Sequence, residues 1–359
     1  MSNTLERCLA IYFHLMGLSC SYKGKSHAWF RTLTTIYMCL MLIELIAQIW
    51  SYFQWIQWQL VDLSTNQETE EPDDQHLRFY VNLVGSIDVT YKLIHILLIL
   101  QSIVCRRQEQ RLLDELPECK LSYNLCCQLI LEVILACQIC SLNFFGAILN
   151  DDPNFLLGLR EILSYQAVRS RYLQIVILIA RLEVQLEESV WHRIHDDDYE
   201  RSRSSYTHTV YLMQCLSKLY GPSILLMNIL CLGDCIVVCN VYIIISNWTE
   251  SKLTWLLLLK SACAMLTTLL KISIICLACH RCTAKSKLLR QQLNARRCRT
   301  NFERSLIDDY ILHIMQNPIE FDVFGMYQLN LMALTGMFLF LLEALVIFLQ
   351  FVSLTNISK

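Results

Sequence analysis

The chain of 359 residues is 55% hydrophobic, carries only 17% charged residues and has a mean hydropathy of +0.39. A soluble protein of this size is about 45–50% apolar and about 25% charged, so these proportions exclude an ordinary soluble domain. The net charge of −2 is too close to neutral for a nucleic-acid-binding protein, and we expect no nucleic-acid partner.

Long apolar blocks recur along the whole chain, with the length that a helix needs to cross about 30 Å of hydrocarbon. They predict an all-α membrane protein with one domain over residues 1–359 and seven transmembrane helices. The fourth block is the least apolar because Arg160, Arg169 and Arg171 lie in or beside it, and a six-span interpretation without it stays open. The expected spans are roughly residues 32–53, 79–104, 124–149, 158–180, 220–246, 254–279 and 324–351.

Lysine and arginine are distributed unevenly between the segments that flank these spans. The N-terminal segment and every second segment after it hold 21 of them, whereas the intervening set holds 2. Because cytoplasmic segments carry the excess of positive charge, we predict a cytoplasmic N-terminus and, with seven spans, an extracellular C-terminus. The two N-x-[ST] sequons, at Asn247 and Asn356, fall on the predicted outside and are the expected glycosylation sites.

The sequence contains 18 cysteines, and none falls in a predicted outer segment, so we expect no extracellular disulfide framework. Cys231, Cys235 and Cys239 recur every four residues, which we interpret as packing on one helix face. The run "CLACHRC" at 276–282 has no second cluster to complete a metal site. We expect no metal and no cofactor. The chain also lacks a glycine-rich phosphate loop, a nucleophile elbow and an H-E-x-x-H motif, so an enzyme is not expected.

Two predicted cytoplasmic segments, residues 181–219 and 280–323, are long and rich in helix-forming residues. We expect them to extend the later spans as helices that pack on each other or on a second subunit. Asn317 and Pro318 should end the second segment's helix. Its apolar residues recur at the spacing of an amphipathic helix, and they are Leu288, Leu289, Leu293, Leu306, Ile307, Ile311, Leu312 and Met315.

Ionisable residues inside the spans are costly, at about 2.5–3.5 kcal/mol each near the bilayer centre, so they face a bundle interior or water. Asp88 and Lys92 are four residues apart and are expected to pair on one helix face. In the alternative interpretation, all these residues only pair within the bundle and hold the helices in register. The set comprises Glu44, Asp88, Lys92, Glu132, Asp234, Lys260, Lys271 and Glu343.

The C-terminal region carries two short motifs. "FDVFGMY" at 321–327 matches an F-x-x-x-G-[aromatic or aliphatic]-[aromatic] pattern before the last span, and "LVIFL" at 345–349 runs into Gln350 and Phe351. The chain thereby resembles the insect chemoreceptor superfamily and, within it, the gustatory receptors. Glu343 and Ala344 stand where that family usually has a Thr-Tyr pair. The effect of this departure on conduction is left open.

The resemblance implies a tetrameric, ligand-gated, non-selective cation channel in the plasma membrane of sensory neurons. The last span would line the pore near Gln350 and Phe351. Glu343 and Gly336 lie seven and fourteen residues before Gln350 and share its helix face. They are therefore the further candidate pore residues, and pairing of Glu343 with Lys260 or Lys271 is the alternative. The partners would be membrane lipid, a small-molecule tastant, with a bitter compound as the first expectation, and identical or related gustatory receptor subunits.

The resemblance also implies a ligand pocket in the outer half of the subunit, where aromatic and polar side chains are available. An odorant receptor of the same fold is the alternative function. A G-protein-coupled receptor would need the opposite orientation, and a secondary transporter would need internal repeats that we do not find. The candidate ligand residues are Tyr80, Asp88, Tyr91, Phe144, Tyr165, Arg169, Tyr242 and Trp255.

Overall fold

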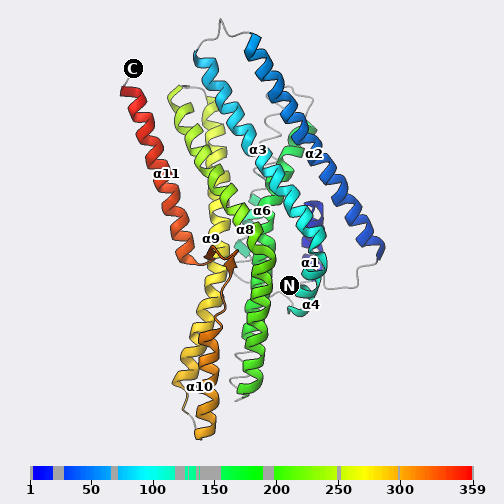
Figure 1. The fold of residues 1–359 in the computed structure, drawn as a ribbon, viewed down its shortest axis with the longest axis vertical. Helices are drawn as coiled ribbons and strands as arrows, with labels where there is room; N and C mark the ends of the chain where they lie inside the picture. Colours follow the sequence, from blue (N-terminus) through cyan, green and yellow to red (C-terminus); the bar gives the residue numbers. More distant parts are fainter. Residues whose placement is uncertain are drawn as a thin grey trace.

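The computed structural model describes residues 3–18, 28–65, 72–117, 126–127, 129–134, 137, 155–188, 198–248, 252–297 and 300–357. The described residues form a bundle of long helices with one small hairpin (Figure 1). The elements are α1 (Asn3–Leu15), α2 (Ala28–Thr65), α3 (Pro72–Val104), α4 (Arg106–Glu115), α6 (Phe155–Leu186), α8 (Tyr199–Trp248), α9 (Lys252–Ala295), α10 (Asn301–Gln316), β1 (Asp322–Val323), β2 (Tyr327–Gln328) and α11 (Leu331–Ile357).

Several helices are longer than a membrane is thick. The 50 residues of α8 rise about 75 Å at 1.5 Å per residue, against about 30 Å of hydrocarbon. Its first half, together with the end of α9 and α10, extends beyond the other helices at one end of the bundle (Figure 1). This arrangement confirms an all-α protein whose later helices continue past the apolar region.

Four described helical segments are long and apolar enough to cross a membrane: Thr32–Trp58, Gly85–Val104, Tyr199–Val238 and Met265–Ala295. A shorter apolar segment covers Leu331–Ile347. The predicted span 158–180 falls inside α6, and most of span 124–149 lies outside the described residues. The number seven and the orientation therefore stay predictions.

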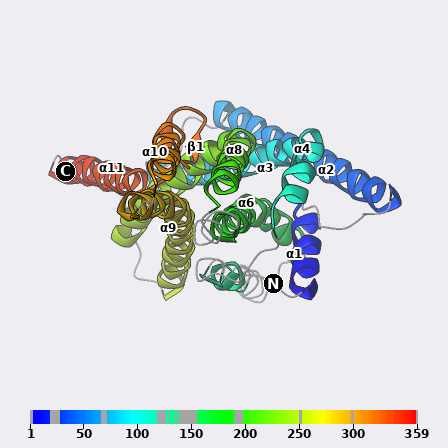
Figure 2. The ribbon, with the colours of Figure 1, turned by 90° about the horizontal axis from the view of Figure 1, so that it is seen from below.

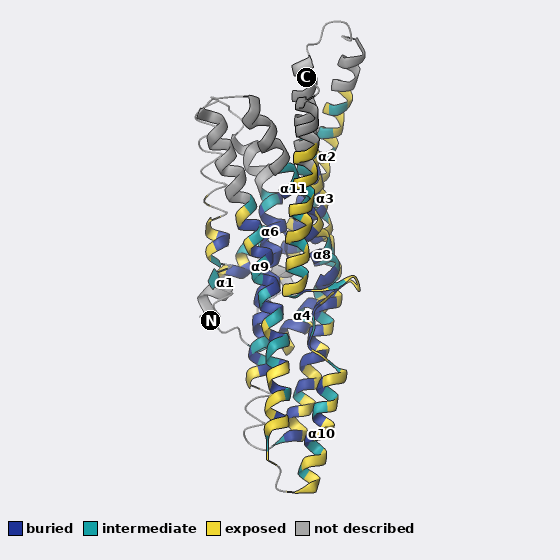
Figure 3. Ribbon diagram, turned by 90° about the vertical axis from the view of Figure 1, so that its left-hand side faces the viewer, coloured by how far each residue is buried: buried dark blue, intermediate teal, exposed yellow. Residues whose placement is uncertain are grey.

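The helix α6 lies at the centre of the bundle, among α1, α3, α8 and α9 (Figure 2). Every side chain from Gln166 to Leu182 is buried. Figure 3 shows the buried residues concentrated at this level, whereas α11 is largely exposed. The polar residues between Gln166 and Leu182 are thus surrounded by protein.

The last helix begins at Leu331, later than the expected start of the span at 324. Residues 322–328 instead form the antiparallel hairpin β1–β2, in which Asp322 lies opposite Gln328 and Val323 opposite Tyr327. The turn has φ values of 54° at Phe324 and 74° at Gly325, and this left-handed conformation cannot continue a helix. The motif before the last span is therefore a tight turn that positions the start of α11.

The helix α10 packs along α9 and α8. The Oγ1 of Thr300 accepts a hydrogen bond from the Glu303 amide at 3.1 Å and so caps its start, and the helix ends at Asn317 as expected. The apolar residues predicted to form one amphipathic stripe in this segment lie partly on a buried face and partly on an exposed face. Leu289, Leu293 and Ile307 are buried, but another part of the stripe, Leu288, Leu312 and Met315, is exposed.

Candidate functional site: a buried polar centre around α6

Besides Ser164 and Arg181, α6 carries five buried polar side chains that form a centre in the middle of the bundle: Gln166, Arg169, Ser170, Arg171 and Gln174. Buried polar groups cost free energy unless they are hydrogen-bonded, and buried charges need partners as well. These five side chains find partners on α1, α3, α4, α8 and the helical residues 129–134, and Glu132 in turn pairs with Lys271 of α9. The contacts form three clusters.

The first cluster joins aromatic rings to a cation. The Arg169 Nη2 lies 3.2 Å from Asp234 Oδ2, and the Tyr91 hydroxyl donates to the same oxygen at 2.7 Å. Tyr91 and Tyr165 stack with ring centroids 3.9 Å apart, and the Arg169 Cζ lies 5.7 Å from each centroid. This arrangement offers stacked aromatic faces next to a cation whose charge is balanced by a carboxylate.

The first cluster continues toward the hairpin. The Tyr172 hydroxyl donates to Asn228 Oδ1 at 2.6 Å, and Asn228 Nδ2 donates to the Tyr327 hydroxyl at 2.7 Å. Tyr172 lies one turn after Arg169 on α6, and Tyr327 begins β2. Hydrogen bonds therefore connect the centre of the bundle to the hairpin that precedes α11.

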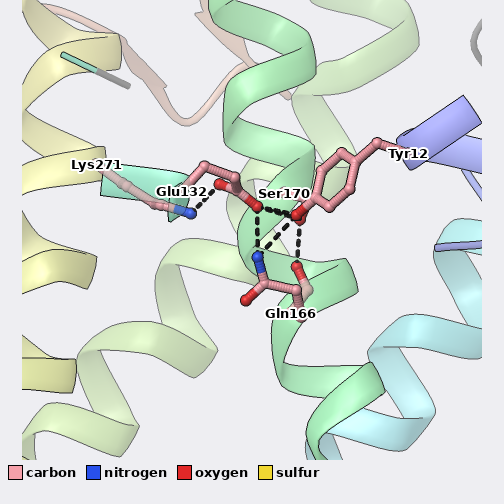
Figure 4. Close-up of polar contacts among 5 residues, drawn as sticks. All are labelled: Tyr12, Glu132, Gln166, Ser170 and Lys271. Atoms are coloured by element: carbon pink, nitrogen blue, oxygen red, sulfur yellow. Dashed lines mark hydrogen bonds and ion pairs between the residues drawn. The ribbon is translucent and has the colours of Figure 1, made fainter. Parts of the chain in front are cut away.

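The second cluster surrounds Glu132 (Figure 4). Its Oε2 pairs with the Lys271 ammonium, and its Oε1 accepts hydrogen bonds from the Gln166 amide at 2.6 Å, the Ser170 hydroxyl at 2.6 Å and the Tyr12 hydroxyl. A buried ion pair of this kind requires such additional donors to offset the desolvation of two charges. The cluster ties α1, residues 129–134, α6 and α9 together.

The third cluster lies further toward α4. The Arg171 Nη2 is 3.3 Å from Glu109 Oε1, its Nη1 donates to Gln174 at 2.5 Å, and its Nη2 donates to Gln101 Oε1 at 3.2 Å. The Tyr220 hydroxyl donates to Glu109 at 3.1 Å, and its ring centroid lies 4.6 Å from the Arg171 Cζ. These partners account for Arg171, which lowers the apolarity of the predicted fourth span.

The structure brings together three of the sequence-predicted ligand residues, Tyr91, Tyr165 and Arg169. Asp88 pairs instead with Lys92 at 2.6 Å, as its spacing predicted. Tyr80, Tyr242 and Trp255 belong to α3, α8 and α9, but their side chains lie outside the described residues, as does Phe144 altogether.

Tyr172 and Asn228 were not predicted from the sequence as site residues. Neither residue has a charge or a motif to mark it, and only the helix packing shows that they meet. Asp234 stood out as a charge in a span, but nothing in the spacing of the sequence identified Arg169 as its partner.

The candidate pore residues Gly336, Glu343 and Gln350 are exposed on α11, at the edge of the bundle opposite α2 (Figure 2). The side chain of Phe351 is not among the described ones. Glu343 does not pair with Lys271, which contacts Glu132 in the second cluster; the Lys260 side chain is outside the described residues. The sequon residues Asn247 and Asn356 fall in the last turns of α8 and α11, at the same end of the bundle (Figure 1).

No group of three His, Cys, Asp or Glu side chains in the described ranges is arranged to hold a metal ion. Cys231 and Cys235 are buried in the packing between helices. The arrangement around α6 is thus one of charge pairs and aromatic rings.

Comparison with known proteins agrees with this architecture. The profile of the family described as 7tm Chemosensory receptor matches residues 6–355. The Drosophila melanogaster protein named "Putative gustatory receptor 9a" is 40% identical over 362 residues, which cover 99% of this chain and 100% of that protein.

Two solved structures share the fold. The insect olfactory receptor OR5 from Machilis hrabei in complex with eugenol superposes with a TM-score of 0.69 at 14% identity, over 97% of this chain and 98% of that chain. A second structure of the same receptor has a TM-score of 0.65 at 15% identity, over the same shares. The family is one of receptors rather than enzymes, as the sequence predicted. The chain belongs to the 7tm chemosensory receptor family.

Proposed function

We propose that the chain is a gustatory receptor subunit and that its assembly is a ligand-gated, non-selective cation channel. The exposed polar face of α11 is the observation that carries this proposal. Glu343 and Gln350 lie on an apolar helix at the edge of the subunit, and both side chains are exposed. A carboxylate that faces lipid costs several kcal/mol. If four subunits place their α11 helices around a common axis, the carboxylate faces a water-filled path instead.

The proposed subunit has seven spans, a cytoplasmic N-terminus and an extracellular C-terminus. The 21 to 2 distribution of basic residues supports this orientation. Exposed apolar side chains on the extended helices, including Leu288, Phe302, Leu312 and Met315, favour contact with another subunit at the cytoplasmic end. The assembly is a homo- or hetero-tetramer of gustatory receptor subunits.

The proposed ligand is a small organic tastant, with a bitter compound as the first candidate. The stacked Tyr91 and Tyr165 beside Arg169 support a site for an apolar or aromatic molecule with a polar group. The Machilis receptor that shares the fold was solved with eugenol. The site would lie in the plasma membrane of a sensory neuron.

The test is expression in oocytes, alone and with candidate gustatory co-subunits, under voltage clamp against a panel of bitter compounds and sugars. A ligand-evoked cation current that reverses near 0 mV in mixed Na⁺ and K⁺ is expected. Current that requires the odorant co-receptor would favour the odorant alternative. Absence of current in every combination, with surface delivery verified, would contradict the proposal.

The orientation has its own test. An epitope after Lys359 should be labelled on intact cells, and an epitope before Met1 should be labelled only after permeabilisation. Labelling of both epitopes on intact cells, or of neither, would contradict an odd number of spans.

A further inference from the structure

A cavity of about 690 Å³ opens between α3, α4 and α8. Its lining changes character along its length. Ile94, Leu97 and Leu226 contribute apolar side chains at one end, and Arg111 and Lys218 contribute basic side chains at the other. Since α3 and α8 are antiparallel, the residues before 104 on α3 lie beside those after 219 on α8.

The cavity therefore straddles the boundary at which two expected spans meet their extended segments. The expected span 79–104 ends between Leu97 and Arg111, and the expected span 220–246 begins between Lys218 and Leu226. With these expected spans in a bilayer, the apolar end would lie at the depth of the acyl chains and the basic end at the depth of the lipid headgroups.

The charges at the basic end favour an anion. Arg111 and Lys218 are exposed, and among the described residues neither has a carboxylate oxygen within 4.0 Å. The one carboxylate in the lining, Glu115, lies 3.3 Å from His208 Nε2. Two basic side chains thus remain for an acceptor-rich group such as a phosphate.

We propose that this cavity binds one anionic phospholipid from the leaflet on the α4 side, with its phosphate between Arg111 and Lys218 and an acyl chain along Leu97 and Leu226. The inference goes beyond the proposed function, and it needs only that the chain spans a membrane. A lipid is favoured over a free phosphate because the apolar end continues directly from the basic end.

The rear wall of the cavity connects it to the polar centre. Gln101 lines the cavity, donates to the Leu219 carbonyl and accepts from Ser223 and Arg171. Pro222, also in the lining, has no amide hydrogen for the helix bond to residue 218. Gln101 therefore belongs both to the wall of the lipid site and to the third cluster.

The test is native mass spectrometry of the full chain purified in a neutral detergent. Dioleoylphosphatidylserine and dioleoylphosphatidylcholine, which have the same acyl chains, are titrated separately. One phosphatidylserine per chain should bind at least tenfold more tightly than phosphatidylcholine. The double variant Arg111→Gln/Lys218→Gln should lose this preference, and Leu97→Trp should weaken retention of both lipids.

The matched control is Arg107→Gln/Arg304→Gln, which removes two exposed arginines that do not line the cavity. It should keep the preference for phosphatidylserine. Equal binding of the two lipids by the wild type, or equal loss in both double variants, would overturn the site. Retention by Leu97→Trp at the wild-type level would exclude the cavity as its place. Displacement of phosphatidylserine by millimolar inorganic phosphate would overturn the choice of a lipid.

Discussion

Asn228 on α8 donates its side-chain amide to the hydroxyl of Tyr327 on β2 over 2.7 Å, and its carbonyl oxygen accepts from Tyr172 on α6. One side chain therefore links the central helix of the bundle to the hairpin that precedes α11. If α6 contributes to the ligand site and α11 to the pore, this link is a route by which the two affect each other. Such a route is demonstrated only by energetic coupling.

The first prediction concerns this link. Tyr172→Phe and Tyr327→Phe each remove one hydroxyl and leave the ring, at a net cost of about 1 kcal/mol for a neutral hydrogen bond. Each should shift the ligand concentration for half-maximal current by up to about fivefold. The double variant should shift it by less than the product of the two, because both bonds pass through Asn228. Shifts that multiply independently would contradict the coupling.

The second prediction concerns the buried ion pair of the second cluster. Lys271→Met leaves the Glu132 carboxylate buried without its cation, which should destabilise the protein by about 3–5 kcal/mol. Adding Glu132→Gln should restore most of the loss, since the amide keeps an acceptor for Gln166 and Ser170. Melting temperature from fluorescence-detected size exclusion is the measurement.

The matched control for this pair lies on the same helix. Lys285 is 2.9 Å from Glu183 but is 26% exposed, so Lys285→Met should cost at most about 1 kcal/mol. A cost for Lys271→Met as small as that for Lys285→Met would contradict the assignment of Glu132 and Lys271 as a buried pair.

The third prediction uses two glycines of α8 as a matched pair. A Cβ at Gly221 would lie 3.1 Å from the Phe324 amide nitrogen and 3.3 Å from the Asp322 carbonyl oxygen, whereas a Cβ at Gly233 would meet nothing within 4 Å. Gly233→Ala should be neutral or stabilise the helix by up to about 1 kcal/mol. In Gly221→Ala the added Cβ displaces the hairpin, so this variant should not gain that helix stability. It should also change channel opening at normal surface levels. Identical behaviour of the two variants would contradict a role for this close approach.

The sequence predicted the helical class, the family and the pairing of Asp88 with Lys92, because apolar block length, short motifs and i,i+4 spacing are local properties. It could not predict that Arg169 meets Asp234 or that Lys271 meets Glu132, since each pair is brought together only by helix packing. The hairpin was missed for a related reason. Its residues resemble the start of an apolar span, and the left-handed turn at Phe324 carries no signal beyond one glycine.

The fourth prediction is a pH dependence at the contact of α8 with α10. Burial and the nearby Arg203 guanidinium lower the pKa of His313, whose Nε2 lies 2.8 Å from Thr207 Oγ1. The unfolded chain then binds a proton at a pH at which the folded chain does not, so stability should fall as the pH drops through about 6.5. Tyr206, at 6.1 Å between ring centroids, and Asn317 also face the ring and do not titrate there.

The measurement is the melting temperature of the wild type and of His313→Gln at pH 7.5 and pH 5.5. The wild type should lose more stability than the variant between these values, because glutamine cannot take up the proton. An equal loss in both proteins would assign the acid sensitivity to other groups.

The last prediction concerns the proposed pore face of α11. If four copies of Gln350 meet near an axis, Gln350→Arg places four positive charges in one ring, and cation entry is opposed electrostatically. Current should fall sharply at normal surface levels.

Gln350→Leu is the neutral control of similar size and should conduct more than the arginine variant, and Gln350→Glu should keep cation current and strengthen divalent block. Glu343→Gln should reduce the preference for cations over anions, since this exposed carboxylate would lie about two helical turns before Gln350 on the same face. The measurements are reversal potentials and Ca²⁺ block under voltage clamp, with surface labelling of each variant. Normal permeation in a Gln350→Arg homomer would leave helix–helix hydrogen bonding between subunits as the role of this face.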